Sequence, residues 1–512
     1  MKALFTMRFP RLSSRCIRAL AAAIAICLAA DSLESETIRQ FRVAIRGRLA
    51  VPGASHLIFG DIDIDSLGRV LYTTSLTDGR SAIFAEDRGT TTPLLFSFDE
   101  VPGRAPDRFE VFIEVSGNAS GDVAFIAATF LAQGHQVYLL RDGVISRIAG
   151  TGDLVPDPPG DRFVGFDQVQ LLDDGSLYFS ATIAGPVGQR RGIYRSRSGQ
   201  TQAAIVPGRR YFGTRVVEET LQYDVNEEGS IAALTLVTDA DALVDEDPLS
   251  EMVLETAGVL RTIASSEFTL AGGIEAVRYF AITFDQVHVD GSGAASFFAS
   301  TTQHLLGGVF VNPTGRFLGN ARAVAQGDPA PTGAGDRFRE FGPFDRSAAG
   351  TLVFTATTDR RPAGGFFLQK EGAIHTLGLV GAERPGGVGL WTGFLMAEIN
   401  GHDEFVLTDR DGLIQTGVFR GRVVPELPDL IAAIRGFATA PGLDPATRAA
   451  LQRRIVLLVT ASQRKDARLM ARQASQLRDW LKGQTDRIEP RLLIRLDIML
   501  DDLVHLLSGP AS

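Results

Sequence analysis

Three aspartates at alternate positions, Asp61, Asp63 and Asp65, have the spacing that most directly suggests chemistry. Alternate residues of a β-strand point to the same face, so these carboxylates would lie side by side. Calcium prefers carboxylate oxygens as ligands, and the run matches the start of a calcium-binding loop. Ser66 stands where an EF-hand has glycine, however, and Tyr72 stands where it has a bidentate glutamate. The run therefore predicts either a calcium site or a solvated strand face, and no other metal or cofactor is expected.

No spacing typical of an enzyme active site occurs elsewhere. The histidines show no HxH or HExxH pattern, and the chain has no GxSxG motif, no Walker loop and no GxGxxG after a strand. We therefore predict no catalytic and no cofactor-binding residues. If the protein were an enzyme, the best candidates would be polar residues that are not repeated along the chain. These are His56, Asp61, Tyr223, His288 and His402.

The elements that position these residues follow from an internal repeat. Residues 152–184 and 327–359 align without a gap and share thirteen identities. Both contain the triplet Asp-Arg-Phe, which also occurs at residues 107–109. Fixed-period similarity of this kind marks a repeat architecture. A residue that recurs at the same place in several units usually serves packing, so the triplets predict buried phenylalanine plugs, with Asp and Arg paired locally, rather than catalysis.

Each repeat unit has a polar turn that ends in glycine, followed by strands of alternating apolar residues. The turn glycines are Gly68, Gly121, Gly175, Gly229, Gly293, Gly350 and Gly401. Short, evenly spaced strands with one motif in about 50 residues predict a propeller of four-stranded blades. The fold class is therefore mainly β, with a seven-bladed β-propeller over residues 58–424. Residues 31–57 form a leading segment whose strand, Phe41 to Ile45, is predicted to close blade seven.

The pattern changes after Pro425 and Pro428. Apolar residues then recur at three and four positions, which predicts four amphipathic helices in a small helical domain over residues 425–512. Asp444 is predicted to cap the second helix, with Pro445 at its first position.

The first thirty residues predict a secretory signal peptide, cleaved near Ala30. Five basic residues precede a short apolar run, and both cysteines, Cys16 and Cys27, lie in this segment. The mature protein would be periplasmic or secreted, without disulfides and without a transmembrane segment. Loss of the basic residues makes the formal net charge of −9 more negative still. An acidic surface argues against nucleic acid as a partner.

The unit pattern resembles the secreted bacterial choice-of-anchor tandem-repeat proteins. The features that carry the likeness are the turn glycine, the strand pattern G-x-[LV]-x-F-x-A, and the GDxxP and GDRFxxF stretches before it. The turn asparagine of that family appears as Asn118, Asn226 and Asn400, while Asp65 and Leu172 replace it elsewhere. Residues 427–507 are similar in length and helix pattern to the FIMAH helical domain. Both resemblances imply binding or accessory roles and bring no catalytic residue.

Together these observations predict an exported, non-catalytic binding module. The protein is expected to be a monomer, with a protein or glycan partner at the cell surface. Two other functions stay open. One is a propeller lyase or hydrolase that acts on an extracellular polysaccharide, with polar residues at the channel mouth as acid and base. The other is an anchoring or assembly protein that docks through its helical domain. The identity of the ligand is not predicted.

Overall fold

The computed structural model describes most of residues 38–482, together with single residues up to 504. The longest gaps within this range are 47–56, 240–247, 267–278, 302–306, 314–319, 383–389, 424–429 and 438–442. Contacts divide the chain into two compact units, one built on Phe41–Arg422 and one that contains Val423–Trp480. Each unit is described by itself.

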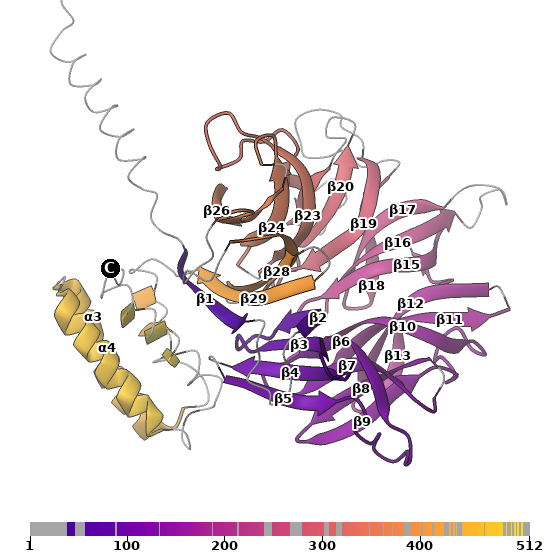
Figure 1. The fold of residues 1–512 in the computed structure, drawn as a ribbon, viewed down its shortest axis with the longest axis horizontal. Helices are drawn as coiled ribbons and strands as arrows, with labels where there is room; N and C mark the ends of the chain where they lie inside the picture. Colours follow the sequence, from indigo (N-terminus) through magenta and orange to yellow (C-terminus); the bar gives the residue numbers. More distant parts are fainter. Residues whose placement is uncertain are drawn as a thin grey trace, which may run out of the picture. The chain divides into compact units, whose positions relative to one another are not determined.

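The first unit contains seven antiparallel sheets, which are the seven predicted blades (Figure 1). The strands of blade one are β2 (Leu57–Ile64), β3 (Val70–Leu76), β4 (Ser81–Asp87) and β5 (Thr90–Phe96). Blade two consists of β6 (Phe109–Gly117), β7 (Val123–Thr129), β8 (His135–Arg141) and β9 (Val144–Gly150). Blade three consists of β10 (Arg162–Leu171), β11 (Leu177–Gly185), β12 (Gly188–Arg197) and β13 (Gln200–Ile205).

Blade four has a short additional strand and contains β14 (Arg210–Tyr211), β15 (Arg215–Val225), β16 (Ile231–Asp239), β17 (Leu249–Thr256) and β18 (Val259–Ser265). Blade five contains β19 (Tyr279–Val289), β20 (Ala295–Thr301), β21 (Gly308–Asn312) and β22 (Ala321–Ala325). Blade six contains β23 (Phe338–Arg346), β24 (Leu352–Thr358), β25 (Gly365–Lys370) and β26 (Ala373–Leu379). Blade seven contains β27 (Phe394–Ile399), β28 (Glu404–Asp411), β29 (Ile414–Val423) and β1 (Ile38–Arg46).

The ring is closed by a strand from the N-terminal side of the chain. β1 lies beside β29 as the outer strand of the seventh sheet, in the position that the sequence assigns to Phe41 to Ile45. The first strands of neighbouring blades also lie against one another: β2 contacts β6 and β27, β6 contacts β10, and β19 contacts β15 and β23. β27 also contacts β23. Pairing by a strand from the other end of the chain removes an exposed edge at the point of closure.

The repeated phenylalanines fill the space between blades. Phe109, Phe163 and Phe338 of the three triplets are at most 2% exposed, and each packs its ring against aromatic neighbours in its own blade. The aspartates of two triplets accept the backbone N–H of the adjacent arginine, at Arg108 and Arg337, but no ion pair joins the two side chains of a triplet in the described residues. Asp107 also accepts hydrogen bonds from the Thr129 hydroxyl and the Leu131 N–H. The prediction of buried phenylalanine plugs is therefore confirmed. The predicted local pairing of Asp and Arg occurs only in part, through backbone N–H groups and through the ion pair of Asp161 with Arg190.

The turn asparagines join one blade to the next. Asn118, Asn226 and Asn400 each donate a side-chain hydrogen bond to a carbonyl in the turn of the following blade, at Leu172, Asp290 and Asp65 respectively. The oxygen of each side chain accepts the N–H four residues later, at Asp122, Ser230 and Glu404. In blade seven Asp403 adopts the positive φ of 58° that glycine adopts in the turns of the other blades. An amide that both donates and accepts can therefore shape its own turn and join two blades.

Two of the four predicted helices have described bounds in the helical region. They are α3 (Pro445–Gln463) and α4 (Ala467–Lys482). Asp444 caps α3 by accepting the N–H groups of Ala446 and Thr447, with Pro445 in the first turn, as predicted. The first and last predicted segments are described only in part, and the residues described there are helical, among them Leu430, Ile431 and Ile434 in the first and Leu496, Leu500 and Leu503 in the last. No helix of the described residues is long and apolar enough to span a membrane.

Candidate functional site

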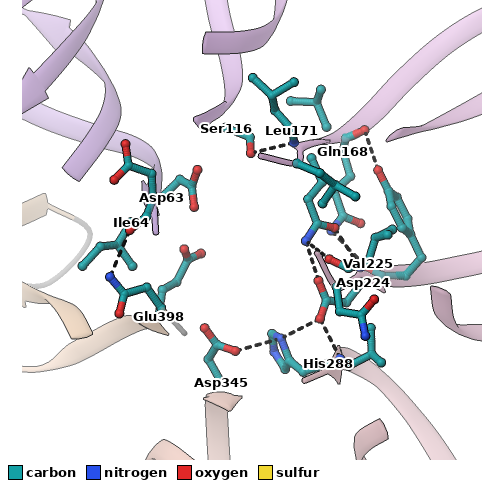
Figure 2. A pocket seen from close by; sticks show the side chains of 18 of the residues that line it. Asp63, Ile64, Ser116, Gln168, Leu171, Asp224, Val225, His288, Asp345 and Glu398 are labelled. Atoms are coloured by element: carbon teal, nitrogen blue, oxygen red, sulfur yellow. Dashed lines mark hydrogen bonds and ion pairs between the residues drawn. The ribbon is translucent and has the colours of Figure 1, made fainter. Parts of the chain in front are cut away.

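A cavity of about 820 Å³ lies where the first strands of the seven blades converge. In each blade a turn joins the first strand to the second. The residue two positions before the first residue of this turn lines the cavity, so every blade contributes one side chain at the same level. These residues are Asp63, Ser116, Gln170, Asp224, His288, Asp345 and Glu398. Figure 2 shows six of them labelled around the opening. Asp61, Glu114 and Gln168 add a second level of polar side chains.

Many of these side chains also bind the backbone of the next blade. The Asp63 carboxylate accepts the Gly117 N–H at 2.7 Å, and the Asp61 carboxylate accepts the Val115 N–H at 2.8 Å. The same contact recurs around the ring. The further pairs are Ser116 with Leu171, Gln170 with Val225, Asp224 with Val289, Gln286 with Phe344 and Asp345 with Ile399. These bonds fix the orientation of the side chains, so the polar lining is preorganised.

Four carboxyl groups from blades seven, one and two form one side of the cavity, which we call the acidic wall: Asp61, Asp63, Glu114 and Glu398. Asp61 and Glu114 are hydrogen-bonded to each other through their side chains. None of the four forms an ion pair with an arginine, lysine or histidine in the described part of the chain. The acidic wall is therefore an accumulation of carboxyl groups without a cationic partner among those residues.

Burial and mutual repulsion raise the pKa of every group in the acidic wall. Burial, with the charge of Asp63 nearby, raises the pKa of Asp61 to about 7. Burial and the neighbouring Asp65 raise the pKa of Asp63 to about 6. Burial and Asp61 raise the pKa of Glu114 to about 10, and burial also raises the pKa of Glu398 well above its usual range. At neutral pH the acidic wall therefore holds protons that the same groups would release in water.

The opposite side of the cavity contains a cation that partly compensates its carboxylates. His288 Nδ1 lies 3.0 Å from Asp345 and 3.7 Å from Asp224 (Figure 2). Burial alone would lower the pKa of His288, but the two carboxylates outweigh it and raise this pKa to about 10. Burial would raise the pKa of Asp224, but its contacts with His288 lower it instead. This group, the His288 triad, thus contains an imidazolium ion held between two carboxylates.

The arginines near the cavity are occupied by carboxylates outside the acidic wall. Arg191 lies 3.1 Å from Asp167, and Arg69 lies 2.9 Å from Asp65. Arg346 pairs with Asp290. A positive charge that could neutralise the acidic wall would therefore have to come from a ligand or from residues that are not described.

The three aspartates predicted from the sequence all border the cavity, but their side chains have different surroundings. Asp61 and Asp63 face the cavity, but Asp65 accepts the N–H groups of Leu67 and Arg69 in the turn and also pairs with the Arg69 side chain. No set of three or more His, Cys, Asp or Glu side chains in the described residues is arranged to hold a metal ion. The calcium hypothesis stays an untested prediction, and Asp65 is already engaged by other groups.

The other candidates are only partly brought together. Tyr223 and His288 line the same cavity as Asp61, whereas His56 and His402 lie outside the described residues. Sequence reasoning did not find Glu114 and Glu398. The sequence contains a pattern that could have identified Glu398. Glu398 stands two positions before the turn residue Asn400, as Asp63 stands two positions before Asp65. This equivalence is missed when the units are aligned on their turn glycines, because Asp403 stands at the glycine position in blade seven.

Several solved structures show a distant similarity to this chain, all at low identity. YCF48 from Cyanidioschyzon merolae is 13% identical over 74% of this chain and 98% of its own, with a TM-score of 0.37. A puromycin-hydrolyzing peptidase from Mycobacterium tuberculosis is 14% identical over 76% of this chain and 57% of its own, with a TM-score of 0.40. A gluconolactonase from Xanthomonas campestris is 12% identical over 59% of this chain and 82% of its own, with a TM-score of 0.29. This likeness carries no argument about activity, and the propeller assignment rests on the seven sheets.

A search of curated proteins finds no match. The sequence model of a family of unknown function (DUF7453) matches residues 132–418, which is more than half of the chain. The chain belongs to this family. The resemblances to the choice-of-anchor tandem-repeat proteins and to the FIMAH domain stay expectations from the sequence.

Proposed function

We propose that this member of the family is a binding module whose channel mouth takes a cationic group of its ligand. The observation that carries the proposal is the acidic wall, in which Asp61, Asp63, Glu114 and Glu398 face one cavity without a cationic partner in the described residues. Two unit charges about 4 Å apart attract by about 4 kcal/mol at an effective dielectric constant of about 20. A bound ammonium group would therefore favour the ionised carboxylates over the protonated groups that the free protein holds at neutral pH.

Two features of the cavity favour binding over chemistry. The lining residues Asp61, Asp63 and Asp345 are held by backbone N–H groups of the next blade, which fixes them as a rigid receptor. The His288 triad contains one cation for its two carboxylates and is partly compensated, whereas the acidic wall has no cation among the described residues. A ligand with a cation at one end and hydrogen-bonding groups at the other fits this asymmetry.

The proposal predicts that spermidine, a small flexible cation, raises the melting temperature of the wild-type protein at low ionic strength. Binding to the folded state alone stabilises it, by about 2.7 kcal/mol at a ligand concentration one hundred times Kd. Glu398→Gln should lose most of this shift, because it removes one carboxyl group of the acidic wall. Glu340→Gln, an exposed position on β23, is the matched control and should keep the shift. Equal shifts in both variants would rule the site out.

A second candidate, acid and base catalysis on a polysaccharide, is favoured by one observation. The Asp61 and Glu114 carboxyl groups are hydrogen-bonded, with pKa values of about 7 and about 10. Two adjacent carboxyl groups with separated pKa values can act as proton acceptor and donor. If this candidate is correct, release of reducing sugar from a polysaccharide should disappear in Glu114→Gln and persist in Glu110→Gln, an exposed neighbour on β6. A protein that binds spermidine and releases no sugar is a binding module.

We also propose that the protein is exported, because the basic and apolar runs of the first thirty residues have the pattern of a signal peptide. The expected chain then begins near Asp31. Intact mass spectrometry of the exported protein measures this directly, and a mature form that retains Met1 would contradict it.

A further inference from the structure

A second cavity, of about 850 Å³, lies between blades three and four. We call it the side groove. It is bordered by β13, by the segment 206–209, and by the turns that follow β15 and β17. Leu172, Glu227 and Glu228 line both the side groove and the channel cavity. The two cavities therefore adjoin, and a single extended ligand could occupy both.

The charges of the side groove favour a basic ligand. Asp157, Asp174, Glu227, Glu228 and Glu255 supply its carboxyl groups. Its two arginines are engaged by the protein. Arg195 donates to the Ser176 hydroxyl at 2.8 Å and lies over the Tyr178 ring, while Arg209 donates to the carbonyls of Ala204 and Gly258. The carboxyl groups thus exceed the arginines in number, as they do in the acidic wall.

The wall of the side groove includes the edge of a sheet. β13 is the last strand of blade three, and Gln202, Ala203 and Ala204 of this strand line the groove. Edge strands expose backbone N–H and C=O groups on one side, and proteins usually protect them with proline or charged side chains. The outer strands of the other blades follow this rule or carry histidine: β5 has Pro93, β9 has Arg147, β18 has Arg261, β22 has Arg322, β26 has His375 and β1 has three arginines.

β13 has the sequence QTQAAI, with no proline and no titratable side chain. One position of β13 is equivalent to the proline of β5 in blade one. Pro93 of β5 lies opposite Phe84, and Ala203 of β13 lies opposite Tyr194 in the same register. Both pairs sit directly beside a register shift. A proline is compatible with pairing at this position, so the N–H of Ala203 is not required by β12 and is available to a partner.

We propose that the side groove binds an extended basic peptide, which pairs with the edge of β13 and places a basic side chain against Glu227 and Glu228, where the two cavities adjoin. The proposal rests on the proposed function, because these two carboxyl groups also line the channel cavity that takes the cation. Added strands obtain affinity from backbone hydrogen bonds and specificity from alternate side chains. The six residues of β13 extend for about 20 Å at about 3.3 Å per residue, so a peptide of about seven residues covers the strand.

The test uses a fluorescein-labelled heptapeptide of alternating lysine and valine, measured by fluorescence anisotropy against the full-length protein. Three further peptides serve as comparisons: the same sequence with alternate backbone nitrogens methylated, an alternating glutamate and valine sequence, and the unlabelled parent as competitor. We expect the parent to bind at low salt, and we expect methylation to weaken binding at least tenfold. The acidic peptide should not bind. Equal binding of the parent and the methylated peptide would overturn the proposal.

Ala203→Pro is the matched protein variant, because it gives β13 the proline that β5 carries at the same position. We expect its melting temperature to stay close to that of the wild type and its affinity for the parent peptide to fall at least tenfold. Its response to spermidine should be unchanged. If the variant binds the peptide as well as the wild type does, the edge of β13 is not used. If it fails to fold, the methylated peptide still decides the question.

The charge contribution is tested by Glu228→Lys, at the junction of the two cavities, with Glu340→Lys on blade six as control. Glu228→Lys should weaken peptide binding about tenfold, and Glu340→Lys should weaken it less than twofold.

The experiments distinguish failure of this inference from failure of the proposed function. If spermidine binds and loses its effect in Glu398→Gln, but the peptide does not bind, only the peptide proposal fails. If β13 pairs with a second copy of the chain, light scattering would show a dimer that Ala203→Pro abolishes, and this would also overturn the proposal.

Discussion

Replacing Glu114 with glutamine should stabilise the propeller, and the gain should grow as the pH rises. The pKa of Glu114 is raised to about 10 in the folded protein, chiefly by burial and by the adjacent Asp61. A carboxyl group with a raised pKa contributes its full stability below the pKa of the unfolded chain and loses it as the pH rises toward the folded value. Glutamine does not titrate and can still donate a hydrogen bond to Asp61. The gain should therefore be near zero at pH 4.

At pH 8 the expected gain is on the order of 2 to 4 kcal/mol, because each unit of pKa shift corresponds to about 1.4 kcal/mol. Urea unfolding at pH 4, 6 and 8 measures it. Glu110→Gln provides the control, since Glu110 lies on the same strand but is exposed. The account of the acidic wall would be wrong if the stability difference between Glu114→Gln and wild type were the same at all three pH values.

Removal of residues 31–47 should destabilise the whole propeller, because these residues include β1. This strand is the outer member of the seventh sheet, and its loss leaves β29 as an unpaired edge at the point of ring closure. We expect the melting temperature to fall by about 10 °C or more, with a broader transition, since several kcal/mol is a large part of the stability of a domain.

The control for this truncation is a chain that begins at Asp31 and keeps β1. Differential scanning calorimetry compares the two proteins. An unchanged melting temperature after removal of residues 31–47 would show that β1 does not contribute to closure.

The number and order of the blades could be predicted because a glycine in each turn recurs at a nearly constant interval. Gly175 and Gly350 mark equivalent turns, and the strands follow them at the same distance in both units. The closing strand was predictable for a related reason, since the seventh unit lacked a fourth strand. These features depend on local sequence patterns that each blade repeats.

The acidic wall was harder to predict, since it depends on long-range proximity. Asp63 and Glu398 are 335 positions apart in the chain and become neighbours only when blade seven meets blade one. The alternation of Asp61, Asp63 and Asp65 indicated a common strand face, but the last of them follows the end of β2 and belongs to the turn. Periodicity within one strand could not show that Glu114 and Glu398 complete the group.

The helical domain could be predicted in part. The segments of α3 and α4 are long, and α3 begins with a clear cap at Asp444. The described residues of the two outer segments are helical as well, although only part of each segment is described. Apolar spacing indicated all four segments but does not by itself give the bounds of a helix.

The central claim is that a cation binds where the acidic wall retains protons, and the protons released on binding measure it most directly. Spermidine should lower the raised pKa values of Asp61, Glu114 and Glu398, so that about one proton leaves for each spermidine bound near pH 7. Isothermal titration calorimetry in phosphate and in Tris, which differ in heat of ionisation, counts these protons. The account predicts a saturable heat that differs between the two buffers and a smaller proton release in Glu398→Gln. No saturable heat, or the same heat in both buffers, would contradict it.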